Sequence, residues 1–247
     1  MDKLAGSFRS EKEARACYNR FDQTICVSQY VHDDFCQLLN FQRPCRVLYN
    51  TVESDKILAG ASEAAPELAN DGKIRLVAVG TLKQSKGYMR LLNISKRLRD
   101  EQSPVHLYIL GIGPLQQEME EYIRQNKLQD TVTLLGYQTN PYKYVSKCDL
   151  FVCASFAEGF STAATEALIV GTPVCTVEVS GMKEMLGENN EWGIVTENSE
   201  EALYQGIKGL LDHPAMHVQD KEKAAERGKT FNSENTVKAV EDMFQNL

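Results

Sequence analysis

The segment KIRLVAVGTLKQSKG, residues 73–87, carries the pattern that decides the fold. Its apolar run over residues 74–79 ends at Gly80, and a polar loop then leads into helical spacing over residues 88–99. A short apolar run that is closed by glycine is typical of a buried strand. The helical pattern directly behind it indicates a strand–loop–helix unit.

The same unit recurs along the chain, and its repetition predicts the architecture. Strands that alternate with helices favour a parallel sheet with both faces covered. The right-handed crossover rule then predicts an α/β fold with a doubly wound, Rossmann-like parallel sheet. Beyond the first unit we expect strands at residues 105–110, 132–135, 150–154 and 174–177, helices between them at 115–126, 142–147 and 162–170, and C-terminal helices at 200–211, 215–229 and 233–244.

The first part of the chain is organised differently. It shows only two candidate strands, at residues 24–27 and 46–49, and two candidate helices, at 11–20 and 31–39. These are too few elements for an independent core. The segment 53–72 is rich in Ala, Glu and Ser and is typical of a linker. We therefore expect residues 1–50 to be the tail of an N-terminal domain, residues 51–72 to be a linker, and residues 73–247 to be the main α/β domain with its C-terminal helices.

Composition and charge exclude several classes of protein. With 43% hydrophobic and 25% charged residues, the 247-residue chain is typical of a folded globular protein. Its net charge of −7 disfavours broad nucleic-acid binding, so no nucleic-acid partner is expected. No apolar run approaches the roughly 18 residues of a membrane span, and the first residues lack a signal-peptide pattern. We therefore expect a cytoplasmic protein.

The cysteines form no close pair. Seven are present, none in a Cys-x-x-Cys arrangement, which favours reduced thiols over disulfides. Cys17, Cys26, Cys36 and Cys45 are evenly spaced, but zinc ligands usually come in close pairs. We therefore expect buried thiols and no metal site.

Candidate binding residues follow the predicted strands. In an open parallel sheet, ligands bind at the carboxyl ends of the strands. Each motif there is common by itself, since a glycine after a strand usually only makes a turn, but their placement at successive strand ends indicates a binding site. The motifs are residues 80–87 after the first strand, residues 111–114 after the second, residues 136–137 after the third, residues 157–162 after the fourth with Glu166 in the helix that follows, and residues 180–182 after the fifth.

These motifs, in this order, resemble the retaining glycosyltransferases of family four, which have the GT-B architecture. The most specific is SFAEGFSTAATEAL, residues 155–168, and the similarity covers about residues 73–212. The match is to the C-terminal, donor-binding half of those enzymes. Upstream, residues 18–22, 26–29 and 47–50 are similar to the end of the acceptor-binding half and its hinge. Within the family, the sequence is most similar to bacterial enzymes that build capsular or other cell-surface polysaccharides.

The resemblance implies a role for each motif residue. Lys86 corresponds to the lysine that binds the diphosphate, and Glu158 to the glutamate that contacts the hydroxyls of the donor sugar, so these two are the candidate catalytic residues. Glu166 corresponds to the glutamate that accepts both ribose hydroxyls. The fold class normally uses no metal or cofactor, so fixed cations and helix N-termini must stabilise the leaving group. The other candidate donor-binding residues are Gly80, Thr81, Gly111, Gly113, Gly136, Tyr137, Gly159, Phe160, Ser161 and Thr162.

The implied reaction is the transfer of a hexosyl group, with retention, from a nucleoside-diphosphate sugar. A UDP-sugar is the expected donor, and a saccharide or lipid-linked saccharide is the expected acceptor. The family's mechanism is generally described as front-face attack through an oxocarbenium-like state. The resemblance therefore implies that Glu158 positions the donor rather than acting as a nucleophile. The implied partners are a missing N-terminal half or a partner subunit, and a lipid-linked acceptor implies peripheral contact with the inner face of the membrane.

One residue departs from the family pattern. Thr81 stands where the family usually has an arginine directly after the first-strand glycine. A charged hydrogen bond contributes roughly 1.5–3 kcal/mol, which corresponds to about 10- to 100-fold in rate. Lys83 or Arg90 is the hypothetical source of the second charge. The alternatives are a non-catalytic nucleotide-binding or partner subunit of a split glycosyltransferase, and a sugar-nucleotide epimerase of the same architecture.

Overall fold

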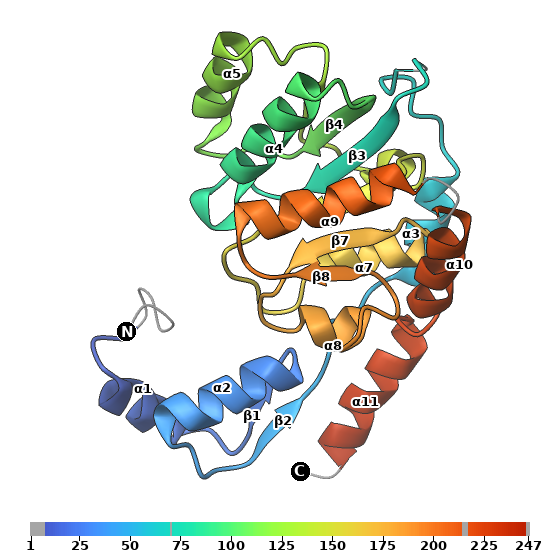
Figure 1. Cartoon of the computed structure of the whole chain (residues 1–247). Coiled ribbons are helices and arrows are strands. Elements are labelled where there is room, and N and C mark those ends of the chain that lie inside the picture. The colour runs from blue at the N-terminus through green and yellow to red at the C-terminus, as the bar shows by residue number, and fades with distance from the viewer. Residues whose placement is uncertain (1–7, 70, 214–216, 246–247) are drawn as a thin grey trace.

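A six-stranded parallel sheet forms the centre of the computed structural model, which describes residues 8–69, 71–213 and 217–245 (Figure 1). The strand order is β5-β4-β3-β6-β7-β8, and every neighbouring pair is parallel. This order confirms the doubly wound sheet that the sequence predicted. The strands are β3 (Ile74–Val79), β4 (Val105–Leu110), β5 (Val132–Gly136), β6 (Leu150–Cys153), β7 (Val174–Val177) and β8 (Ile194–Thr196).

Helices pack on both faces of the sheet. One face is covered by α4 (Tyr88–Asp100), α5 (Gln116–Gln125) and α9 (Glu200–Asp212). The other is covered by α3 (Ser54–Ala61), α6 (Tyr142–Val145), α7 (Thr162–Ile169) and α10 (His217–Gly228). Because the sheet is covered on both sides, its strands read as continuous apolar runs, and all residues of β4, β6 and β7 are buried.

The N-terminal segment forms a separate two-stranded unit. It contains α1 (Glu11–Tyr18), β1 (Thr24–Cys26), α2 (Gln29–Leu39) and β2 (Cys45–Val47), and its two strands pair in parallel. Within the part of this unit that the structure describes, the core has three buried members, Ala14, Leu39 and Phe41. Figure 1 shows this unit beside the main sheet, with α11 (Ser233–Gln245) extending toward the same side.

The segment that the composition assigned to a linker contains a helix. In α3, Ile57 is buried in a small cluster with Val52 and Ile169. Ser and Gly in this helix are weak helix formers, so the helix depends on tertiary packing rather than on local propensity. Two further short elements were not predicted, β8 and α8 (Met182–Leu186), because three and five residues carry too little periodicity.

Two predicted segments lie partly outside the described residues. The helix predicted for residues 215–229 begins in the described part at His217, and residues 214–216 lie outside it. The first seven residues of the predicted N-terminal tail also lie outside the described residues. Among the helices of the described residues, none is both long and apolar enough to cross a membrane.

Candidate active site

The candidate residues gather where the strand order reverses. From β3 the chain continues to β4 on one side, and from β6 it continues to β7 on the other, so the loops after β3 and β6 diverge above adjacent strands. A crevice at this point is the usual ligand site of a doubly wound sheet. Lys86 lies in the short 3-10 helix Gln84–Lys86 after β3, and Glu158 lies in the loop after β6.

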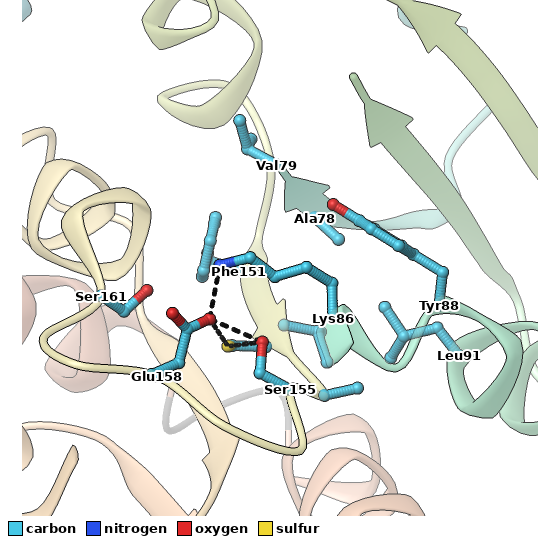
Figure 2. A pocket seen from close by; sticks show the side chains of 12 residues that line it. Ala78, Val79, Lys86, Tyr88, Leu91, Phe151, Ser155, Glu158 and Ser161 are labelled. Atoms are coloured by element: carbon cyan, nitrogen blue, oxygen red, sulfur yellow. Dashed lines mark hydrogen bonds and ion pairs between the residues drawn. The ribbon is translucent and has the colours of Figure 1, made fainter. Parts of the chain in front are cut away.

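Lys86 and Glu158 form an ion pair across this crevice (Figure 2). Lys86 Nζ lies 2.7 Å from Glu158 Oε1, and the two side chains are 26% and 11% exposed. The same carboxylate oxygen accepts a hydrogen bond of 2.6 Å from the hydroxyl of Ser155, which is buried. The pair borders a small pocket of about 20 Å³ that Ser161 and Tyr88 also line. A cation held at the mouth of a largely buried pocket is suited to an anionic ligand.

Two glycines allow the loops to come this close. Gly87, at φ +67°, follows Lys86, and a Cβ there would lie 2.0 Å from the carbonyl oxygen of Ala154. Gly111, at φ +142°, follows β4, and a Cβ there would lie 1.9 Å from the carbonyl oxygen of Gly80. Any side chain at either position would push neighbouring backbones apart. Both residues therefore set the width of the crevice, and the predicted residue Gly113 likewise packs directly against the backbone of Leu82.

Glu166 lies in a second, larger hollow. Its Oε1 accepts a hydrogen bond of 3.2 Å from the hydroxyl of Tyr142. Burial raises the pKa of Glu166, and burial next to this carboxylate raises the pKa of Tyr142 to about 12. The hollow has a volume of about 650 Å³, and Thr162 and α3 line it together with Glu166. A carboxylate oxygen facing open space can accept further hydrogen bonds from ligand hydroxyls.

The loop between the two hollows is fixed from several directions. Ser180 donates a hydrogen bond from its hydroxyl to the carbonyl of Glu158, and Ser28 of the N-terminal unit donates one of 3.3 Å to the carbonyl of Gly159. Ser161 caps α7 by accepting a hydrogen bond of 3.4 Å from the backbone N–H of Ala164. The first N–H groups of α7 have no partner within the helix and carry its positive dipole end. The loop therefore presents backbone donors between Glu158 and Glu166.

The remaining predicted residues divide into two groups. Tyr137 is 68% exposed beside Gly136, at the end of β5, and Thr81 is exposed after β3. Phe160 is buried, and its ring packs against the rings of Tyr49 and Phe231 at centroid distances of 5.2 and 6.2 Å. The Phe160 side chain therefore anchors the loop, and only its backbone remains a candidate for ligand contact.

The two proposed substitutes for the family arginine differ in their surroundings. Lys83 is exposed and immediately precedes the 3-10 helix that carries Lys86. The Arg90 guanidinium lies 3.6 Å from the ring centroid of Phe156 and donates a hydrogen bond of 2.7 Å to Asn198. Arg90 is thus held in place by its neighbours at the edge of the crevice.

Several residues of this site were not singled out from the sequence. Ser155, Tyr142 and Ser28 each hold a candidate residue or its loop by a hydrogen bond. Ser155 belongs to the quoted motif, and Tyr142 follows a strand end, so their positions were open to prediction. The role of Ser28 was not, because it joins residues that are 131 positions apart in the chain.

Comparison with known proteins bears on this geometry. A family model described as "Glycosyl transferases group 1" matches residues 61–230, which include every candidate site residue named above except Ser28. The chain belongs to the group 1 glycosyltransferase family. The matched range begins at the end of α3 and ends after α10, so it covers the whole central sheet.

Two curated bacterial relatives of this group 1 glycosyltransferase chain show how far the similarity extends. Over 207 residues it is 33% identical to the N-acetylgalactosamine-N,N'-diacetylbacillosaminyl-diphospho-undecaprenol 4-alpha-N-acetylgalactosaminyltransferase of Campylobacter jejuni, covering 83% of this chain and 54% of the relative. It is 26% identical over 172 residues to the lipopolysaccharide core biosynthesis glycosyltransferase LpsD of Rhizobium meliloti, covering 70% and 48%. The group 1 chain thus spans about half the length of these relatives.

Solved structures support the GT-B architecture that the resemblance implied. HepE of Anabaena in complex with UDP superposes with a TM-score of 0.84 at 19% identity, over 96% of this chain and 67% of that one. Sucrose-phosphate synthase from Thermosynechococcus elongatus also gives 0.84, at 21% identity, over 99% and 64%. At these identities the likeness shows the fold alone.

Proposed function

We propose that this chain is the donor-binding part of a glycosyltransferase that uses a nucleoside-diphosphate sugar. The observation that carries the proposal is the pairing of Lys86 with Glu158 at the reversal point of the sheet, next to the hollow that holds Glu166. These groups match the parts of a nucleoside-diphosphate sugar. The cation and the N–H groups at the start of α7 suit the diphosphate, and the two carboxylates suit the hydroxyls of the sugar on one side and of the ribose on the other.

Each group has a defined task in the proposed reaction. When the bond between sugar and phosphate breaks, negative charge develops on the diphosphate, and Lys86 with the N-terminus of α7 stabilises it. Glu158 accepts hydrogen bonds from the hydroxyls of the donor sugar, and Ser155 fixes the orientation of that carboxylate. Glu166 accepts the ribose hydroxyls, and Tyr142 positions it.

We further propose UDP as the nucleotide and retention as the stereochemical outcome. The UDP-bound neighbour HepE supports the choice of UDP as first candidate. The name of the Campylobacter relative describes an alpha-linked transfer and a diphospho-undecaprenol-linked saccharide, which supports a lipid-linked saccharide acceptor. Metal-independent catalysis belongs to the same proposal, and activity of the complete enzyme in excess EDTA tests it.

Binding of nucleotides to the purified chain tests the donor site. A thermal-shift panel with UDP, GDP, ADP and CMP is measured on the wild type, on Glu166→Ala and on Glu118→Ala, which removes an exposed glutamate of α5. Ligand at 100 times its dissociation constant adds about 2.7 kcal/mol, and for a chain of this size that raises the melting temperature by roughly 5–10 °C. We expect the shift with UDP in the wild type and in Glu118→Ala, and its loss in Glu166→Ala.

The outcomes separate this proposal from its alternative. A shift with another diphosphate that depends on Glu166 would keep the donor site and change the base. No shift with any nucleotide would favour a subunit without donor binding. If the chain binds UDP but a complete enzyme containing it transfers no sugar, the non-catalytic nucleotide-binding subunit is the better description.

The second charge is tested separately. We propose that Lys83 or Arg90 replaces the arginine that Thr81 lacks, because both flank the crevice. Each is changed to Ala, and UDP binding is measured by titration calorimetry. Loss of one charged hydrogen bond weakens binding by about 10- to 100-fold. Unchanged affinity in both variants would show that Lys86 acts without a second side-chain cation.

A further inference from the structure

The N-terminal unit gathers three metal-binding side chains, and a fourth lies beside one of them, although the sequence spreads the four over 20 residues. The donor atoms of His32, Cys36 and Cys45 all lie within 4.8 Å of one another. Cys26 Sγ lies 3.6 Å from Cys45 Sγ, and Cys36 Sγ lies 3.8 Å from His32 Nε2. We propose that these residues form a structural zinc site with a Cys₃His ligand set.

The distances fit tetrahedral coordination. With zinc–sulfur bonds of about 2.3 Å, the ligand atoms at two corners of a tetrahedron lie about 3.8 Å apart. The 3.6 Å between Cys26 Sγ and Cys45 Sγ is close to this edge length, and the 3.8 Å between Cys36 Sγ and His32 Nε2 is close to the slightly shorter sulfur–nitrogen edge. Three thiolates and one imidazole form one of the common structural zinc sets.

The fold explains why the sequence concealed the set. His32 and Cys36 are four residues apart in α2 and therefore lie on one face of that helix. Cys26 ends β1 and Cys45 begins β2, so the parallel pairing of these strands brings them together. Each element contributes ligands without any Cys-x-x-Cys pair, so the spacing rule, which led us to expect buried thiols and no metal site, has no pattern to detect here. Cys26 is buried, whereas Cys36 and Cys45 are half-buried and can receive a metal ion.

A second layer of contacts orients the histidine. His32 Nδ1 lies 2.8 Å from Asp33 Oδ1, which leaves Nε2 as the free acceptor toward Cys36. Gln29 donates a hydrogen bond of 2.7 Å to the same Asp33 oxygen. A carboxylate on the far nitrogen of a histidine is the usual support of a zinc ligand, because it fixes the ring and its tautomer.

A disulfide between Cys26 and Cys45 explains the cluster less well. The register pairs Cys45 with Thr24, two residues before Cys26. At the usual strand spacing and rise, the two Cα atoms are then about 8 Å apart. This exceeds the roughly 7 Å limit for a disulfide without backbone movement. A metal ion accommodates the longer separation because it sits between the sulfur atoms.

The site would stabilise a unit with little core of its own. Among the described residues, its buried apolar cluster contains just Ala14, Leu39 and Phe41. Small units of this kind usually need a disulfide or a metal to supplement their core. Zinc at this place would join β1, α2 and β2 in one cross-link. It would thereby hold Ser28, between β1 and α2, at the carbonyl of Gly159.

Metal binding to the purified chain under reducing conditions tests the proposal. Zn²⁺ and Co²⁺ are titrated into the wild type, Cys36→Ser, Cys45→Ser, Asp33→Asn and the control Cys17→Ser, whose thiol lies on α1 outside the cluster. We expect about one metal ion per chain in the wild type and the control, with the thiolate charge-transfer and intense visible bands of tetrahedral cobalt. Asp33→Asn should weaken metal binding by about 10- to 100-fold. Cys36→Ser and Cys45→Ser each remove one thiolate ligand, so their cobalt thiolate bands should be weaker than those of the wild type. These two variants should also bind metal more weakly than Asp33→Asn.

A measurement on the unmodified chain guards against misfolded variants. Zn²⁺ should slow alkylation of Cys26, Cys36 and Cys45, read by mass spectrometry, and leave Cys17 unaffected. Any of four results overturns the proposal. These are zinc binding that Cys36→Ser leaves intact, a cobalt spectrum without thiolate bands, equal protection of Cys17, and a disulfide between Cys26 and Cys45 under reducing conditions. The inference is independent of the donor site, and Lys86→Met should leave zinc binding unchanged.

Discussion

The ion pair between Lys86 and Glu158 predicts that removing either partner lowers stability, whereas the two changes shift ligand binding in opposite directions. In Lys86→Met the side chain stays unbranched, becomes one heavy atom shorter and loses its charge. Glu158, only 11% exposed, then retains the hydrogen bond from Ser155 and loses its charged partner. A hydrogen bond to a charged group contributes about 1.5–3 kcal/mol, and the 26% exposure of Lys86 keeps the cost below the 3–5 kcal/mol typical of breaking a fully buried pair. For a chain of this size we expect the melting temperature to fall by about 3–12 °C.

Ligand binding adds a second, sharper expectation. A diphosphate must share or displace Glu158 to reach Lys86, because the two side chains already bind each other. Glu158→Gln removes this competition, so the variant should bind UDP several-fold more tightly than the wild type. Lys86→Met should bind UDP about 10- to 100-fold more weakly. Neither change should affect uridine, which has no phosphate.

A double-mutant cycle measures both effects. Urea unfolding of the wild type, the two single variants and the double variant gives the coupling energy, and calorimetric titration with UDP and uridine gives the affinities. The matched control is Lys96→Met, whose exposed pair with Asp100 on α4 has an N–O distance of 3.0 Å and should contribute less than about 0.5 kcal/mol. A coupling energy no larger than that of this control, or tighter UDP binding by Lys86→Met than by Glu158→Gln, would refute the reasoning.

Three further changes are predicted. Because burial raises the pKa of Glu166, the folded chain disfavours the charged form of this residue. Glu166→Gln should therefore raise the melting temperature at pH 7 but not at a pH below the ordinary glutamate pKa, where Glu166 is protonated in both the folded and the unfolded wild type. The same variant should bind UDP more weakly, and thermal shifts measured against pH test both expectations. Gly111→Ala should lower the free energy of unfolding by more than about 1 kcal/mol, since its Cβ would lie 1.9 Å from the Gly80 carbonyl oxygen. Urea unfolding that matches the wild type would contradict the close approach of the two loops. Ser28→Ala removes the cap of α2 and the hydrogen bond to Gly159. The change should lower the free energy of unfolding by about 1 kcal/mol and speed amide exchange in residues 157–161. Faster exchange confined to α2 would leave Ser28 only a capping role.

The central sheet was predictable because its signal is local. Each of the five predicted strands is a short apolar run, and β3, β4 and β7 have the bounds that the sequence predicted. Short elements were less accessible: α3 lies in a segment whose composition is typical of a linker, and its Ile57 packs against Val52 and Ile169. The roles of the candidate site residues stay predictions until the variants are measured.

The sequence by itself determined the order of strands and helices, the glycines at strand ends and the family motifs around Lys86, Glu158 and Glu166. The order of elements and the strand-end glycines follow from periodicity and residue type, which act over a few neighbouring positions, whereas the motif roles are what the family resemblance implies. Only the tertiary structure decided that Lys86 and Glu158 bind each other across 72 positions, and that Cys26, His32, Cys36 and Cys45 converge. Such contacts depend on which strands become neighbours, and strand pairing is fixed by burial of the whole sheet rather than by any local pattern.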